Sequence, residues 1–178
     1  LIRFIEERGG EVITTPYTTY AKMIAGPYMR KWLIEGHYLS VLTGGAIMAA
    51  VAPQEKVYYR TFQRVLQEPE PEFDEDPEAI LSPYGLRIEH TGESMDNILK
   101  VHYIKKYHPD VALFVQTSPA FCCPSLVTEA MARRIEAVTG VPVVSITYDG
   151  AGGARNDAVI PYLRYPRRRA LPPRFAPP

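Results

Sequence analysis

Two apolar segments of strand length, separated by one segment of helix length, constrain the fold of this chain most strongly. The apolar segments are residues 110–116 and 141–147, and both are nearly continuous. Such runs are typical of strands buried on both faces, as in a parallel sheet. Residues 125–139 between them carry apolar side chains at helical spacing, and Gly140 follows,. The pattern predicts a βαβ unit with a right-handed crossover.

The remainder of the chain is expected to add helices and one strand. Residues 1–8 have the pattern of a short amphipathic helix, residues 11–15 read as a strand, and residues 17–66 are mainly helical in pattern,. Breaks in this last segment are expected at Gly26-Pro27, Gly44-Gly45 and Pro53,. We therefore predict a three-layer Rossmann- or flavodoxin-like α/β fold, with a parallel sheet and an additional helical segment in the N-terminal part.

A further helix is expected before the first strand. Thr91 is a plausible N-cap, Met95, Ile98, Leu99 and His102 follow at helical spacing, and Pro109 should end the helix,.

The net charge of zero, from 20 basic and 20 acidic side chains, hides a local polarity. Residues 68–78 contain seven acids and three prolines with no base, which predicts an exposed connector because the acids repel one another and proline interrupts helices. Residues 164–178 contain five arginines and no acid, so this tail either binds an anionic partner or is a solvated terminus. Without an overall basic excess, a nucleic-acid-binding function is not favoured.

These features divide the chain into four segments. Residues 1–66 form a strand plus a mainly helical segment, residues 67–80 an acidic proline-rich connector, residues 81–165 a cysteine-bearing α/β domain, and residues 166–178 a basic proline-rich tail. No apolar run approaches the length of about 20 residues that spans a bilayer, and no signal peptide is visible. The chain begins with Leu1, which we interpret as the boundary of a fragment.

The chain has two cysteines, Cys122 and Cys123, and they are adjacent. Neighbouring Cα atoms lie about 3.8 Å apart, closer than ordinary disulfide geometry allows. A disulfide scaffold is therefore excluded, and a reducing, cytoplasmic compartment is the better expectation.

The cysteines also lie where a ligand site is expected. In an open α/β sheet, ligands bind beyond the carboxyl ends of the strands, and residues 117–124 and 148–154 are the two loops at that edge. Cys122 and Cys123 come just before the helix of residues 125–139, whose N-terminus favours negative charge on a thiolate. Thiolates bind soft metals and iron–sulfur clusters. The alternative is that the two cysteines are small buried apolar residues.

Other candidate residues carry weaker signals. Glu93 and Asp149 could act as acid or base, although Glu93 also suits the first turn of a helix and Asp149-Gly150 is also a turn signal. Gly152-Gly153 could hold a phosphate, but no lysine follows as in a P-loop. The four histidines have no metal-like spacing and favour structural roles: His37, His90, His102 and His108.

Several motifs together resemble a known family. They are Phe-Cys-Cys-Pro at residues 121–124 within the stretch 108–131, Thr-Tyr-Asp-Gly at residues 147–150, and Gly-Glu-Ser-Met-Asp-Asn at residues 92–97. The stretch from residue 90 to residue 163 resembles the C-terminal region of the proteins related to 2-hydroxyacyl-CoA dehydratases, and in particular the long CoA-substrate-specific enzyme activases that carry a dehydratase-like region.

The resemblance implies an iron–sulfur protein. Family members bind a cluster through cysteines contributed by several domains, and one of these positions falls on Cys122. The next residue is commonly acidic in the dehydratase subunits, whereas this chain has Cys123, so Cys123 is either a second ligand or a neighbour of the site. The resemblance also implies an ATPase activator module or subunit that drives low-potential electron transfer, and an acyl-CoA substrate in the dehydratase branch.

The chain lacks the other cluster cysteines and the ATP-binding motifs of the family. We therefore expect that these 178 residues alone are inactive and hold no stable cluster,. Two alternatives stay open: a thiol or zinc site at Cys122 and Cys123, and a non-enzymatic α/β docking module. Catalytic residues, the substrate and the cluster type are not identified by the sequence, and self-association is left open.

Overall fold

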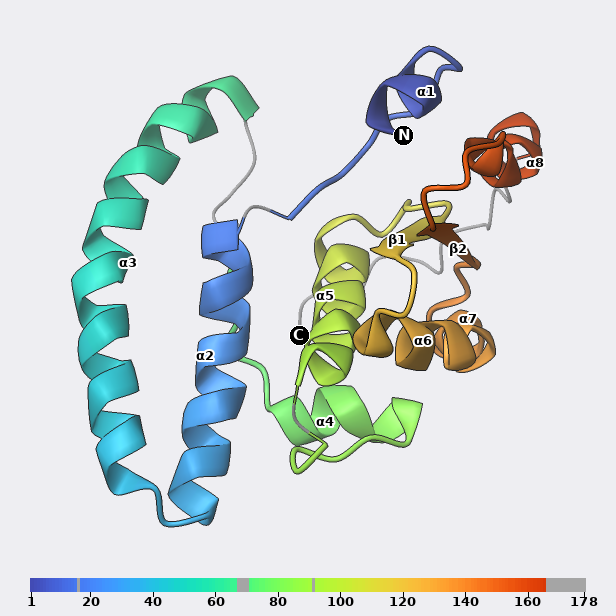
Figure 1. The fold of residues 1–178 in the computed structure, drawn as a ribbon. Coiled ribbons are helices and arrows are strands. Elements are labelled where there is room, and N and C mark those ends of the chain that lie inside the picture. The colour runs from blue at the N-terminus through green and yellow to red at the C-terminus, as the bar shows by residue number, and fades with distance from the viewer. Residues whose placement is uncertain (16, 67–70, 91, 166–178) are drawn as a thin grey trace, which may run out of the picture. The chain divides into compact units, whose positions relative to one another are not determined.

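The computed structural model describes residues 1–15, 17–66, 71–90 and 92–165 (Figure 1). Of these, residues 1–14 and 92–165 form one compact unit, which we call the α/β unit. The described residues between 15 and 90 form a second compact unit, which we call the helical unit. The first helix of the chain thus belongs with the cysteine-bearing segment, and the described part of the acidic segment belongs with the helical unit.

The α/β unit contains the predicted βαβ connection. Strand β1 (Phe114–Pro119) pairs in parallel with β2 (Val143–Tyr148), with Phe114 opposite Val143 and Pro119 opposite Tyr148. The crossover consists of two helices, α6 (Cys123–Ala130) and α7 (Ala132–Thr139), rather than one, because the helix is interrupted at Met131. Gly140 ends α7 with a left-handed φ of 72°, as its place after the helical pattern predicts,.

The prediction of a three-layer Rossmann-like sheet is wrong. The structure is mostly helical (62%), and its described residues contain only the two-stranded parallel sheet. Residues 11–15, expected as a strand, have no regular secondary structure. The apolar signal there is only Val12 and Ile13, of which Val12 packs on the core and Ile13 is exposed. A segment this short forms a strand only where a sheet edge pairs its backbone groups.

The two faces of the sheet pack against different helices. Val144 and Ile146 form a buried cluster with Ile5 of α1 (Ile2–Glu6) and Val159 of η2 (Arg155–Val159). The short helix α8 (Ile160–Arg164) follows η2. Because β1 and β2 are in register, Val115 lies on the same face as Val144 and also packs on the cluster. This face of the sheet is therefore covered by the two ends of the described unit.

On the other face, α5 (Glu93–Tyr107) packs against α6 and α7. The predicted apolar positions Met95, Ile98 and Leu99 are fully buried. Thr91, the expected cap, lies outside the described residues, and Gly92 stands at the N-cap position. The helix ends at Tyr107, two residues before Pro109, as predicted.

The helical unit is built on a helical hairpin of α2 (Tyr17–Ile34) and α3 (Tyr38–Leu66), which lie side by side in Figure 1. Gly36 turns the chain with a left-handed φ of 79°. The His37 N–H donates to the Trp32 carbonyl (2.8 Å) and the Gly36 N–H to the Leu33 carbonyl (3.2 Å). This pattern is a Schellman motif, which satisfies the last carbonyls of α2. The helices α4 (Pro77–Leu81) and η1 (Ser82–Tyr84) complete the unit.

Both helices of the hairpin continue through residues expected to break them. Pro27 lies inside α2, and Pro53 and the pair Gly44-Gly45 lie inside α3. An internal proline costs a helix about 3 kcal/mol because it removes one hydrogen bond and crowds the preceding turn. Packing along the hairpin offsets this cost, since Pro27 and Met23 are both buried. Across the described residues, no helix has the combination of length and apolar character that a bilayer crossing requires.

Candidate functional site

The cysteine pair lies at the carboxyl edge of the parallel sheet. Pro119 and Tyr148 are opposite each other at the strand ends, so the two loops that follow start side by side. The Ala120 N–H donates to the Tyr148 carbonyl at 3.2 Å and holds the loops together one residue further. The prediction that both loops lie at one edge is confirmed. Strand β1 extends to Pro119, however, and α6 begins at Cys123, so the cysteine loop is shorter than expected.

Phe121 gives this loop its turn. It has a φ of 63°, in the left-handed region, and among the described non-glycine residues it is the one with a positive φ. A residue with a Cβ pays about 1 kcal/mol or more for this conformation. The turn leaves the Phe121 side chain 92% exposed and brings Cys122 into extended backbone at the N-cap of α6.

Side-chain hydrogen bonds fix the first turns of α6. The Gln116 amide on β1 donates to the Ser125 carbonyl at 2.8 Å. The Asn97 amide on α5 donates to the Thr128 hydroxyl at 3.0 Å, and that hydroxyl donates to the Pro124 carbonyl at 3.0 Å. The helix that follows the cysteines is therefore held by both β1 and α5, which restricts where the two thiols can lie.

The donor set at this edge is incomplete for a metal. Cys122 is half-buried, Cys123 is exposed, and both are free thiols. No group of three or more Cys, His, Asp or Glu side chains suited to a metal ion exists among the residues that the structure describes. Zinc sites use four ligands and iron–sulfur clusters typically use four thiolates. The two cysteines could supply at most part of such a ligand set, because the chain has no other cysteine.

Asp149 organises the second loop. Its Oδ1 accepts the Ala151 N–H at 3.0 Å, and its Oδ2 accepts from the Arg155 guanidinium at 2.5 Å. The Ala151 N–H, followed by the Arg155 charge, holds the pKa of the Asp149 carboxyl below its ordinary value,. Tyr148 adds a hydrogen bond from its hydroxyl to the Asn156 side chain at 2.7 Å. Asp149 is therefore an ionised turn-forming residue and is poorly suited to act as an acid near neutral pH.

The histidines lie at separate points of the two units, His37 and His90 in the helical unit and His102 and His108 in the α/β unit. The His90 Nδ1 accepts the Arg87 N–H at 3.0 Å, and the His102 ring meets the Tyr103 ring edge-on at 5.1 Å. His37 lies in the hairpin turn, 3.8 Å from Glu35, and His108 follows the last turn of α5. These positions fit the structural roles that we expected. Glu93 begins α5, and its side chain lies outside the described ones.

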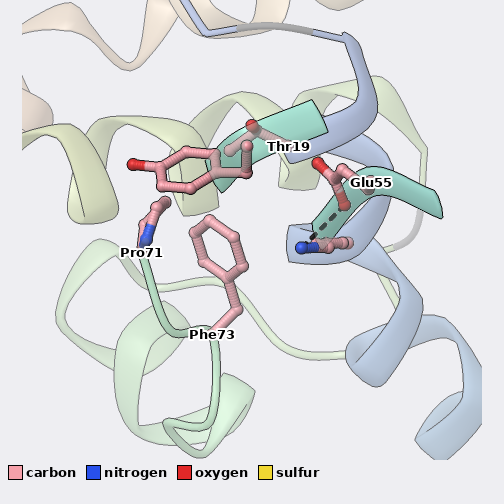
Figure 2. A pocket seen from close by; sticks show the side chains of 6 residues that line it. Thr19, Glu55, Pro71 and Phe73 are labelled. Atoms are coloured by element: carbon pink, nitrogen blue, oxygen red, sulfur yellow. Dashed lines mark ion pairs between the residues drawn. The ribbon is translucent and has the colours of Figure 1, made fainter. Parts of the chain in front are cut away.

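Sequence reasoning missed one buried ion pair, which lies in the helical unit. Lys22 of α2 and Glu55 of α3 approach to 2.7 Å, with side chains 19% and 10% exposed. Figure 2 shows Glu55 and its dashed ion pair beside Thr19, Pro71 and Phe73, which line the same pocket. Glu55 is the single acid of the 29-residue α3, and that isolation is the signal that could have revealed a structural pair.

Comparison with known proteins adds no relative to these observations: no family model, no curated protein and no solved structure matches the chain.

Proposed function

We propose that this chain contributes Cys122 to an iron–sulfur cluster that is completed by cysteines from outside these 178 residues. The observation that supports the proposal is the position of Cys122. It is half-buried, stands at the N-cap of α6, and lies at the carboxyl edge of a parallel strand pair. The free N–H groups of a helix N-terminus stabilise negative charge, and thiolates are the ligands that such clusters use.

The wider function follows from the family resemblance. The protein would belong to the 2-hydroxyacyl-CoA dehydratase and CoA enzyme activase group, in which an ATPase module delivers low-potential electrons to the cluster. Within this proposal, the chain is a cytoplasmic electron-transfer component, and an acyl-CoA is the candidate substrate of the assembled enzyme. Cys123 lies beside the ligand and is the natural second thiolate if the cluster is larger.

Anaerobic reconstitution tests the proposal in two steps. The 178-residue chain alone, incubated with iron and sulfide, should hold no stoichiometric cluster, because its only thiols are two neighbours. The complete assembly that contains this chain should bind iron and acid-labile sulfide with the visible absorption of a cluster. The Cys122→Ser variant of that assembly should lose most of this absorption.

The Ser125→Ala variant is a matched control, because it changes a small polar side chain three residues along the same loop and helix. Retention of the full cluster by Cys122→Ser would refute the assignment. Stoichiometric zinc in place of iron would support the alternative zinc site. If the Cys123→Ser variant also loses the cluster, Cys123 is a second ligand.

A further inference from the structure

The outer face of α3, the side that does not contact α2, is apolar along most of its length. Large apolar side chains on it are exposed at seven positions: Leu39, Leu42, Ile47, Val51, Val57, Tyr58 and Val65. The inner side of α3 is already used by the hairpin, where Glu55 pairs with Lys22, and a Cβ at Gly44 would lie 3.0 Å from the Trp32 ring. Large apolar side chains that lie together on one face of a helix are normally covered by another element or by a partner.

The absence of charge on the first half of α3 sharpens this expectation. Residues 38–54 contain no charged side chain, although a solvent-facing helix of this length would ordinarily carry several. Small residues alternate with the large ones there, and Ala46, Ala49 and Ala50 are exposed. A second helix could therefore approach the backbone of α3 closely.

The charges on the second half of α3 favour one arrangement of two such helices. Beyond residue 54 the exposed charged side chains Lys56 and Arg60 are basic, whereas the acid Glu55 is buried against Lys22. A parallel pair of α3 helices would place each basic residue beside its own copy. An antiparallel pair places the basic half of one helix over the uncharged half of the other, and it also opposes the helix dipoles.

The area available is sufficient for a specific dimer. From Leu39 to Val65 the outer face is about 40 Å long at 1.5 Å per residue, and half the circumference of a helix is roughly 16 Å. Contact along this strip would bury on the order of 600 Å² on each chain, or about 1,200 Å² in total, which is the lower limit of specific interfaces.

We propose that two copies of this chain associate through the outer faces of α3, in an antiparallel arrangement about a two-fold axis near Val51. The contact is isologous: both copies use the same face, and if residue i of one copy contacts residue j of the other, then residue j of the first contacts residue i of the second. The proposal does not depend on the cluster function, because α3 belongs to the helical unit and Cys122 to the α/β unit.

Sedimentation equilibrium of the 178-residue chain tests the association. Wild type should be dimeric at micromolar concentration, and Val51→Glu should weaken the dimer by about 100-fold or more, because each copy would bury an unpaired carboxylate. Val138→Glu on α7 is the matched control, since Val138 and Val51 are both 40% exposed valines on helices. Circular dichroism and Trp32 fluorescence verify that both variants are folded. A monomeric wild type, or equal effects of the two substitutions, would overturn the proposal.

Cysteine cross-linking tests the orientation in a Cys122→Ser, Cys123→Ser background. Ala50 and Thr61 are both exposed, and their spacing of 11 residues places them on one face of α3,. Ala50→Cys lies near the proposed axis and should form an intermolecular disulfide on mild oxidation. Thr61→Cys should not, because antiparallel packing separates the two copies of that position by about 30 Å. Efficient cross-linking of Thr61→Cys would indicate parallel helices and contradict the arrangement.

Discussion

Replacing Glu55 with glutamine should destabilise the helical unit by about 3 kcal/mol. The substitution keeps the shape of the side chain but removes the charge opposite Lys22, whose ammonium group lies 2.7 Å from the carboxylate. The side chains are only 10% and 19% exposed, so water can replace the lost partner only in part. Lys22 would then remain as a mostly buried charge that has lost the Glu55 carboxylate.

The magnitude follows from the burial of the pair. Removing one member of a fully buried ion pair costs about 3 to 5 kcal/mol, whereas exposed pairs contribute about 0 to 1 kcal/mol. The residual exposure of Lys22 places the expected loss at about 2 to 4 kcal/mol. A unit of this size is stabilised by roughly 4 to 12 kcal/mol in total, so the effect would be large.

Trp32 makes the measurement specific to the helical unit, because it is the only tryptophan of the chain and lies in α2. Urea unfolding followed by its fluorescence, at one fixed protein concentration, gives the free energy of unfolding for each variant. Glu35→Gln is the control, since the Glu35 side chain is 39% exposed in its i,i+4 pair with Lys31 at 3.6 Å, so that water can solvate the altered group and the change should cost less than about 0.5 kcal/mol. The Lys22→Met, Glu55→Leu double variant should recover most of the loss. If Glu55→Gln unfolds within 0.5 kcal/mol of wild type, the reasoning about the buried pair is wrong.

Two further predictions concern glycine and aspartate positions. Gly45→Ala should stabilise α3 by about 0.5 to 1 kcal/mol, because the new Cβ meets open space,. Gly44→Ala should stabilise it less, because its Cβ would lie 3.0 Å from the Trp32 ring. Thermal unfolding of the two variants compares them, and equal gains in stability would contradict the prediction. The stability that the Asp149 carboxylate contributes should be present above the unfolded pKa and disappear as the pH falls through its lowered folded pKa, whose main cause is the Ala151 N–H,. Asp149→Asn should therefore flatten the acid limb of the stability curve, and an unchanged curve would contradict this reasoning.

The elements that the sequence predicted correctly are those with strong local signals. The apolar run at residues 141–147 closely matches β2, while the run at residues 110–116 overlaps β1 only over residues 114–116, because β1 starts later and extends to Pro119. Gly140 ended α7 because its left-handed backbone is available to glycine at little cost,. The position of the cysteine loop could also be predicted, since parallel strands bring their carboxyl ends to one edge.

The parts that failed depend on contacts between distant residues. Proline is a local helix breaker, but Pro27 and Pro53 lie within helices that the hairpin stabilises. A third strand needs a sheet edge as its partner, and two apolar residues at positions 12 and 13 do not establish one. The Lys22–Glu55 pair joins residues on separate helices, so no periodicity along the chain reveals it directly.

The placement of α1 in the α/β unit also bears on how the chain folds. Ile5 reaches the same buried cluster as Val144, so about 140 residues must be synthesised and arranged before that contact can form, at a high loop-closure cost. The hairpin contacts are far more local, and local contacts form faster. We therefore expect the helical unit to fold first during synthesis. The helix α1 can join its hydrophobic cluster only after β2 has been synthesised.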